Sequence, residues 1–173
     1  MLMIKLVSPS ASYQSSYLEA LKEFVEEGRD LEYRGPQTDE PFTDFLKRIE
    51  GFRLGEGLPK GYVPESVMWL VDDAEFIGEA SIRHTLTEHL LKEGGHIGYV
   101  IRPSKRKQGY GKQILELALE EAKKLDIKNV LLTCDETNIG SAKIIEANGG
   151  VLENAVEIGQ GQPRKLRYWI KNN

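Results

Sequence analysis

Apolar residues recur along the first part of the chain at the spacing of helices. Residues 13–27 carry one every three or four positions, the period of a helix that buries one face. Residues 41–51 have the same period, with Pro41 suited to the first helical turn and Asp39 or Glu40 to the cap. This part of the chain is therefore predicted to contain two helices.

The second part of the chain contains two more helical patterns. Residues 111–125 should form a helix that is followed by a turn at Asp126. Its predicted buried face consists of Ile114, Leu115, Ala118, Ala122 and Leu125. Residues 141–147 form a shorter pattern closed by Asn148 and Gly149, which are residue types typical of helix ends.

Short extended segments separate these helices. Residues 67–71 and 76–83 are apolar runs joined by four residues, which is typical of a β-hairpin, and a further strand over 96–102 should end at Pro103. The other predicted strands are 3–7, 130–134, and an antiparallel pair formed by 151–156 and 166–170. The loops are expected at 55–65 and 84–95.

The order of these elements predicts the fold class. A strand, helix, strand unit over 96–134 lies inside runs of consecutive strands, which predicts an α/β (α+β) fold: a mixed sheet with helices on its faces. No repeat and no linker divides the chain. Residues 1–173 are therefore expected to form a single domain.

Composition limits the functional classes. The 173 residues are 40% apolar and 29% charged, as in ordinary soluble proteins. No apolar stretch approaches the ~20 residues of a membrane span, and the first residues lack the basic-then-apolar order of a signal peptide. Cys134 is the single cysteine, so no internal disulfide can form. A cytoplasmic protein without a membrane partner is expected.

Charge is distributed unevenly along the chain, whose net charge is −4. Residues 19–44 carry nine acids against three bases, a local charge of −6. Residues 102–112 carry five bases and no acid. Such a short basic stretch on an acidic chain favours a small anionic ligand over nucleic acid. The acidic stretch is either solvated surface or one wall of a binding site.

A glycine-bearing turn inside the basic stretch links the strand over 96–102 to the following helix. Its sequence, Arg106-Lys-Gln-Gly-Tyr-Gly111, lets the backbone approach an anion, which the free amides and the dipole of the helix start would bind. A dinucleotide motif is excluded because Ile114 stands where the third glycine belongs. A Walker loop is excluded because Gln113 replaces its Ser or Thr. A plain tight turn is the alternative interpretation.

Three sequence blocks resemble the GNAT superfamily of acyl-CoA-dependent N-acetyltransferases. The R-x-x-G-x-G turn is similar to the family's pyrophosphate loop, and HIGYVIRPS, residues 96–104, resembles its fourth strand. Residues 138–149 resemble its N-x-x-[AS]-x-x-x-x-E-x-x-G helix. The blocks occur in the family's order over residues 96–150. The stretch RHTLTEHLLKEGGHIGY, residues 83–99, is also similar to an uncharacterised bacterial branch, so the resemblance covers most of the chain.

The resemblance implies a mostly antiparallel sheet with a V-shaped cleft for acetyl-CoA, and no metal. It places Val100 and Ile101 against the pantetheine arm, with Asn138 and Ser141 on the other wall. It assigns the pyrophosphate to the turn, where Arg106 and Lys107 add charge. The backbone amides that would hold it belong to Gln108, Gly109, Tyr110, Gly111 and Lys112. Asn138 is equally suited to cap a helix.

Acetyl transfer to an amine needs a base, because an ammonium must lose a proton before its nitrogen attacks the thioester. His96 is the first candidate, since related members carry Glu at this position of an E-I-G-Y motif and an imidazole titrates near neutral pH. Glu79 and His84 are the backups. The alternative is that His96 is a structural histidine bonded at the start of its strand.

The proton donor for the leaving thiolate departs from the family pattern. Many members place Tyr before the Glu of the second helix, and this chain has Ile145 there. Ser141, Cys134 and Tyr110 are candidate replacements, or the thiolate leaves through solvent. Cys134 as a covalent nucleophile is rejected, because a lone cysteine on an apolar strand is usually inert. The substitution also keeps open a rival function, a non-catalytic acyl-CoA-binding or sensor protein with this fold.

The expected acceptor is a small-molecule amine. Four acids of the −6 stretch follow the first helix and would favour a cationic acceptor: Asp30, Glu32, Asp39 and Glu40. Tyr33, Tyr62 and Trp69 are predicted walls of its site. No nucleic-acid partner is expected, and a homodimer remains possible.

Overall fold

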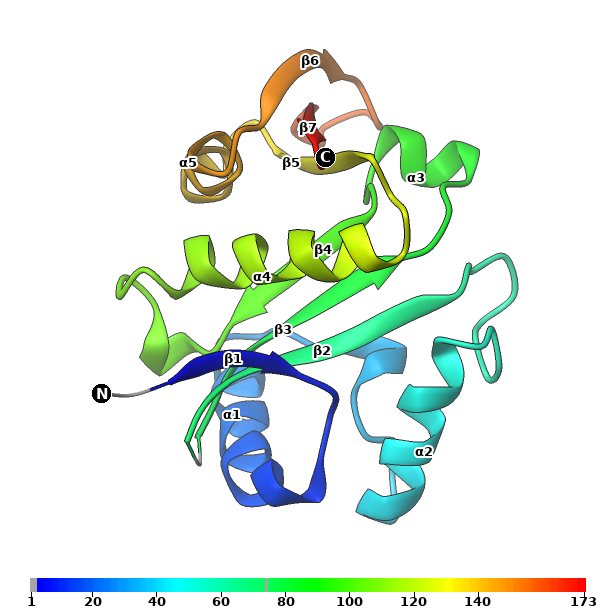
Figure 1. Cartoon of the computed structure of the whole chain (residues 1–173), viewed down its shortest axis with the longest axis vertical. Coiled ribbons are helices and arrows are strands. Elements are labelled where there is room, and N and C mark those ends of the chain that lie inside the picture. Colours follow the sequence, from blue (N-terminus) through cyan, green and yellow to red (C-terminus); the bar gives the residue numbers. More distant parts are fainter. Residues whose placement is uncertain (1–2, 74) are drawn as a thin grey trace.

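The computed structural model describes residues 3–73 and 75–173, which form two antiparallel sheets with helices around them (Figure 1). The strands are β1 (Ile4–Val7), β2 (Glu65–Asp72), β3 (Glu75–Arg83), β4 (Ile97–Ile101), β5 (Asn129–Asp135), β6 (Val151–Val156) and β7 (Lys165–Lys171). The helices are α1 (Gln14–Glu26), α2 (Phe42–Phe52), α3 (Glu88–Lys92), α4 (Tyr110–Lys124) and α5 (Ile139–Ala147). Short 3₁₀ turns are η1 (Ala11–Tyr13), η2 (Glu32–Arg34) and η3 (Pro103–Lys105).

The sheet divides between β4 and β5. The first sheet has the order β1-β2-β3-β4 and the second the order β5-β7-β6, and every ladder in the described residues is antiparallel. The predicted hairpin and the closing antiparallel pair are both confirmed. The expected α/β fold, with antiparallel sheets and flanking helices, is confirmed as well. Because no ladder joins β4 to β5, backbone groups along their facing edges are left for other partners.

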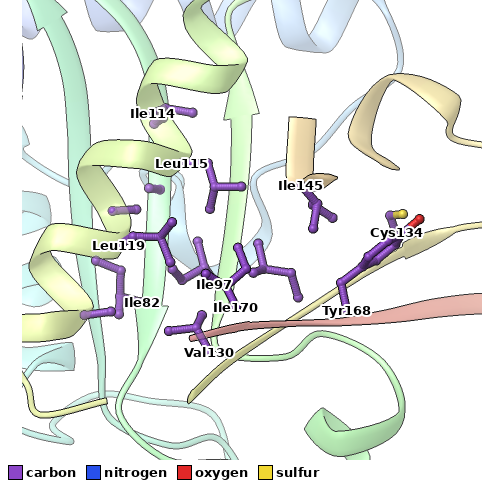
Figure 2. Close-up of a cluster of buried hydrophobic side chains, with 14 of the residues drawn as sticks. Ile82, Ile97, Ile114, Leu115, Leu119, Val130, Cys134, Ile145, Tyr168 and Ile170 are labelled. Atoms are coloured by element: carbon purple, nitrogen blue, oxygen red, sulfur yellow. The ribbon is translucent and has the colours of Figure 1, made fainter. Parts of the chain in front are cut away.

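Helix α4 covers one face of the first sheet, and α1 and α2 lie on its other side (Figure 1). Figure 2 shows Ile114, Leu115 and Leu119 of α4 directed toward a buried cluster that includes Ile97 of β4 and Val130 of β5. Each fully buried aliphatic side chain of this kind contributes about 1.5–3 kcal/mol. This cluster beneath α4, called the α4 core below, therefore holds the ends of the two sheets together.

An aromatic core fills the opposite face, between the first sheet and helices α1 and α2. Tyr17 of α1 stacks on Trp69 of β2 with ring centroids 4.3 Å apart, and Phe45 and Phe76 pack around them. Both Tyr17 and Trp69 are completely buried. The prediction that Trp69 forms a wall of the acceptor site is wrong, because its ring lies inside this core.

Two predictions about local structure also fail. The segment 84–95 is not all loop, since Thr87 accepts a hydrogen bond from the N–H of Leu90 and caps the short helix α3. A five-residue helix is too short to show a helical period in the sequence. Leu125 was expected in the buried face, but it follows the last turn of α4 and is 39% exposed.

The start of α2 differs from the predicted cap. Pro41 is the residue immediately before the helix, and no side chain caps it. The carboxylate of Glu40 instead accepts two hydrogen bonds from Arg48, at 2.7 and 2.8 Å. No helix in the described part of the chain is long and apolar enough to cross a membrane.

Candidate functional site

His96 joins the two sheets where β4 and β5 come closest. Its backbone N–H donates to the carbonyl of Leu131 at 2.8 Å, and the N–H of Leu131 donates to the imidazole Nδ1 at 2.9 Å. Beyond this contact, β4 and β5 form no ladder. The side chain of His96 therefore lies at the apex of the gap between the sheets and is 8% exposed.

A cleft of about 520 Å³ opens between β4 and α5, next to the turn that begins α4. Most of the predicted coenzyme-binding residues line it: Val100, Ile101, Arg106, Lys107, Tyr110, Gly111, Asn138 and Ser141. Gln108, Gly109 and Lys112 are exposed parts of the same turn and lie outside its lining. The fold thus gathers the three sequence blocks around one cavity.

The two glycines of the turn have different physical roles. Gly109 precedes α4 with φ = +87°, a left-handed conformation that disfavours other residues, and a Cβ there would meet nothing within 4 Å. The first N–H groups of α4 have no partner within the helix. Gly111 is helical, and a Cβ there would lie 2.5 Å from Cδ1 of Ile144. Gly109 therefore shapes the turn, and Gly111 allows α5 to approach α4.

The two arginines of the basic stretch pair with acids of the −6 stretch. Arg102 donates to Glu23 at 2.7 Å, and both terminal nitrogens of Arg106 donate to Glu27, at 2.7 and 2.6 Å. Glu23 also accepts from the backbone N–H of Ser104 at 2.9 Å. The carboxylates of α1 thus hold the turn in place. Since Glu23 and Glu27 serve this contact, they do not face an acceptor.

Two cations of the turn remain unpaired. Lys105 is bonded to Glu75 at the hairpin. Lys107 and Lys112 are exposed and have no ion pair within residues 3–73 and 75–173. Of the two, Lys107 lines the cleft, and its side chain is free to meet an anionic group there.

Tyr99 and Ser141 bridge the walls of the cleft. The Tyr99 hydroxyl on β4 lies 3.1 Å from Oγ of Ser141 on α5. Asn138 caps α5, and its Oδ1 accepts from the N–H of Ser141 at 3.1 Å. Tyr99 was missed in the sequence, where its only signal was one hydroxyl within an apolar strand. Burial raises the pKa of Tyr99, so its hydroxyl stays protonated at neutral pH.

The three predicted bases do not form one cluster. No hydrogen bond or ion pair joins them in the described residues. His84 hydrogen-bonds Oγ of Ser66 through Nε2 at 2.9 Å, and burial lowers its pKa. Burial, with the positive charge of Arg83, lowers the pKa of His96 to about 4. Because Nδ1 of His96 accepts a hydrogen bond, its neutral ring carries the proton on Nε2. The geometry favours the structural role that the sequence left open.

Glu79 is the candidate with a pKa suited to proton transfer. It is buried on β3, directly opposite Val100 of β4. Burial raises its pKa to about 7, against the opposing effect of Arg34, whose Nε lies 3.9 Å away. Trp69 Nε1 donates to its carboxylate at 3.2 Å. A carboxylate that titrates near neutrality beside the cleft strand has the properties of a general base.

The residues near the expected acid position are buried. Ile145 is 1% exposed and belongs to the α4 core (Figure 2). Cys134 is also buried in this core, and burial raises the pKa of its thiol. A protonated, buried thiol is a poor nucleophile, which agrees with the rejection of that role.

A second cavity, of about 340 Å³, lies on the side of β4 away from the turn and is called the acceptor pocket below. Its lining includes both predicted tyrosines, Tyr33 and Tyr62. It also contains residues that sequence reasoning missed: Arg34, Glu65, Arg83 and Glu93. Of the four acids predicted to favour a cationic acceptor, Glu32 lines this pocket, and Glu40 is bonded to Arg48.

Comparison with known protein families agrees with this geometry. The model of the acetyltransferase (GNAT) domain matches residues 13–151. The chain belongs to the GNAT acetyltransferase family. No curated protein matches it.

Solved GNAT structures share the fold at low identity. The Salmonella typhimurium acetyl transferase that modifies the N-terminal serine of ribosomal protein L7/L12 is 17% identical, with a TM-score of 0.64 over 97% of this chain and 94% of that one. A dodecameric spermidine N-acetyltransferase from Vibrio cholerae is 15% identical, with a TM-score of 0.63 over 98% and 94%. The microcin C7 self-immunity acetyltransferase MccE, in complex with acetyl-CoA and AMP, is 17% identical, with a TM-score of 0.66 over 97% and 92%.

Proposed function

We propose that this GNAT protein transfers the acetyl group of acetyl-CoA directly to a primary amine of a small molecule. The observation that carries the proposal is the cleft between the two sheets, whose lining includes the glycine turn and the unpaired Lys107. Solved relatives in the family bind acetyl-CoA or coenzyme A. The pantetheine arm would lie along β4 and the pyrophosphate on the turn, with no metal in the reaction.

Backbone alternation identifies an oxyanion donor. The N–H of Arg102 donates to Ile77 of β3 at 2.8 Å. Successive residues of a strand direct their N–H groups to opposite edges, so the N–H of Ile101 is directed away from β3, toward the cleft. This amide would stabilise the oxyanion that forms when the amine attacks the thioester carbonyl. The N–H of Val100 is directed toward β3 by the same alternation, so it is not available to the thioester.

The proton transfers can be assigned to side chains in the same region. Glu79 would accept the proton of the acceptor ammonium, through water because its carboxylate is buried. The amine nitrogen then bonds to the carbonyl carbon, and the carbon–sulfur bond breaks. Ser141, hydrogen-bonded to Tyr99, would protonate the departing thiolate and regain, through water, the second proton that the new amide nitrogen loses. This pair takes the place of the tyrosine that Ile145 replaces.

Relatives of the same fold act on a protein N-terminus and on spermidine. The preference for cationic amines stays a prediction, but it has less electrostatic support: of the four acids that favoured it, Glu40 is used in an ion pair with Arg48 and Glu32 lines the second cavity. A cytoplasmic location and a homodimer also stay predictions.

A coupled assay tests the function against its rival. Purified protein is mixed with acetyl-CoA and a panel of primary amines, and free thiol release is measured with the mass of the acetylated amine. Acetylation with stoichiometric thiol release supports the enzyme. Coenzyme A binding by calorimetry, without transfer to any amine, would instead support the non-catalytic acyl-CoA-binding protein.

A further inference from the structure

Two arginines from different elements line the acceptor pocket. Arg34 comes from η2 and Arg83 from the end of β3. A Cβ at Gly98 of β4 would lie 3.7 Å from Nη2 of Arg83, so this guanidinium lies beside the β4 backbone. Glu79 on β3, which is opposite Val100 of the coenzyme cleft, lies 3.9 Å from Nε of Arg34. Arg34 therefore connects this pocket to the proposed base.

The guanidinium of Arg34 is short of partners. It makes no hydrogen bond with any residue of the described ranges, and its Nε is buried without a partner. Its nearest acid is Glu79, at 3.9 Å, which is beyond hydrogen-bonding distance. A guanidinium has five N–H donors, so an arginine that lines a cavity and uses none of them is suited to bind a ligand.

Arg83 is only partly satisfied. Its Nη1 donates to the carbonyls of Gly94 and Gly95, at 3.0 and 3.1 Å, and its other nitrogens have no hydrogen bond with the described residues. Burial lowers the pKa of Arg83, and the charge of Arg34 lowers it further. Both arginines line the same pocket, so an anionic ligand bound there would interact favourably with both guanidinium groups.

The acids of the pocket already have partners or lie at its rim. Glu65 is buried and accepts the hydroxyls of Tyr33, at 2.6 Å, and of Ser81. Glu93 pairs with His89 at 3.6 Å, and Glu32 is exposed. Glu65 offsets part of the positive charge without forming an ion pair with either arginine. An excess of unsatisfied guanidinium donors therefore remains inside the pocket.

We propose that the acceptor is an amine that carries a carboxylate, bound by Arg34 and Arg83 while its amino group reaches the thioester. This inference rests on the proposed function, which supplies the amine as the acetylated group. It adds the chemical class of the acceptor. A carboxylate matches the planar fork of a guanidinium in a bidentate pair. Gly98 and Val100, two residues apart on β4, are separated by about 7 Å. The carboxylate and the amine are thus a few bonds apart, as in a small amino acid.

The test compares acceptors that differ in the carboxylate. The pairs are β-alanine with propylamine and lysine with cadaverine, and kcat/KM is measured by thiol release. Phosphoethanolamine replaces the carboxylate of β-alanine by a phosphate. We expect the carboxylated member of each pair to be at least tenfold better, and β-alanine to exceed phosphoethanolamine. Equal rates, a preference for cadaverine or a preference for phosphoethanolamine would overturn the proposal.

A binding measurement keeps the inference separate from catalysis. N-acetyl-β-alanine and N-propylacetamide are titrated by calorimetry into the protein loaded with coenzyme A. The carboxylated compound should bind at least tenfold more tightly, and its failure to do so overturns the proposal even if no amine is acetylated. If no amine is acetylated but the carboxylated compound still binds more tightly, the proposed enzymatic function is rejected and the carboxylate-binding site is supported.

Variants connect the preference to the named residues. Arg34→Gln should remove the advantage of the carboxylated compounds without changing coenzyme A affinity, and Arg34→Lys should retain part of it. Lys47→Gln removes an exposed cation of α2 outside the pocket and should leave the preference intact. Thermal unfolding checks that each variant folds. A folded Arg34→Gln that keeps the full advantage would contradict the proposal.

Discussion

His96 and Leu131 exchange two hydrogen bonds across the gap between the sheets, one to the backbone carbonyl and one from the backbone amide to the imidazole. The contact closes the narrow end of the gap, and the cleft opens at the other end, beside Tyr99 and Ile101. A buried backbone N–H without a partner is costly, so the imidazole has a structural task at this point. These hydrogen bonds favour a structural role for His96 over the role of general base.

Replacing His96 should affect stability more than the chemical step. His96→Ala leaves the N–H of Leu131 unsatisfied and should lower the free energy of unfolding by about 1–3 kcal/mol. His96→Asn offers Oδ1 near the place of Nδ1 and should lose less. Both variants, measured below their unfolding temperatures, should keep most of kcat/KM. A folded His96→Ala that loses a hundredfold or more would restore His96 as the base.

The pH dependence of stability provides an independent check on His96. Its folded-state pKa of about 4 lies below the ordinary histidine value of about 6.5, so between these values the unfolded chain binds the extra proton. The contribution is fully present above pH 6.5 and is lost as pH falls toward 4. The stability difference between wild type and His96→Asn, from denaturant unfolding, should therefore be larger at pH 7.5 than at pH 4.5. A pH-independent difference would contradict this assignment.

Glu79 should control the pH dependence of activity. Its raised pKa predicts that kcat/KM increases through a pKa of about 7, and Glu79→Gln should remove this limb and lower kcat/KM by about 10²–10⁴. The variant can still accept the hydrogen bond of Trp69. Between pH 4.5 and 7 the carboxyl group is ionised in the unfolded chain but still protonated in the folded protein. The free energy of unfolding of wild type should therefore fall, relative to that of Glu79→Gln, as pH rises over this range. An unchanged pH–rate profile would exclude Glu79 as the base.

The two glycines of the turn should respond differently to substitution. Gly109→Val disfavours the left-handed conformation and adds a side chain to the turn, so coenzyme A affinity should fall at least tenfold, or about 1.4 kcal/mol. Gly109→Asn is the matched control, because Asn tolerates this conformation better. Calorimetry measures both. If a folded Gly109→Val variant binds coenzyme A with wild-type affinity, the turn is not part of the coenzyme site.

Gly111→Ala should instead cost about 0.5–1.5 kcal/mol in the packing of α5 on α4, because Cδ1 of Ile144 must move away from the new Cβ. Ile144→Val deletes that methyl group, so the double variant should recover most of the loss. Denaturant unfolding of the four proteins forms a double-mutant cycle. If the changes in unfolding free energy of the two single variants simply add in the double variant, the contact with Ile144 is not the reason that Gly111 is required.

Free and paired cations of the turn should contribute unequally to coenzyme binding. Lys107→Gln removes an unpaired charge and should weaken coenzyme A two- to fivefold, or about 0.4–1 kcal/mol, with the effect reduced in high salt. The charge of Arg106 is engaged by Glu27, so Arg106→Gln should change affinity less. The opposite order would mean that coenzyme A displaces Glu27 from Arg106.

The sequence predicted most elements of the fold because their cores are periodic. Ile114, Leu115 and Ala118 lie on one face of α4 as expected, since helical spacing alone selects that face. Leu125 was misplaced because the helix ends before it, and the short helix α3 was missed because five residues carry no period. Such boundaries depend on which backbone hydrogen bonds the surrounding structure completes.

What the sequence by itself determined is the order of most elements and the place of the glycine turn before α4, because glycine conformation and helix starts are local properties of the chain. Only the tertiary structure decided which side chains share a site. The pairing of Arg106 with Glu27, the contact of Tyr99 with Ser141, and the pocket shared by Arg34 and Arg83 bring together residues from different elements. Electrostatic and hydrogen-bond energies depend on distance in space and on burial. Neither quantity is encoded in the spacing of residues along one segment.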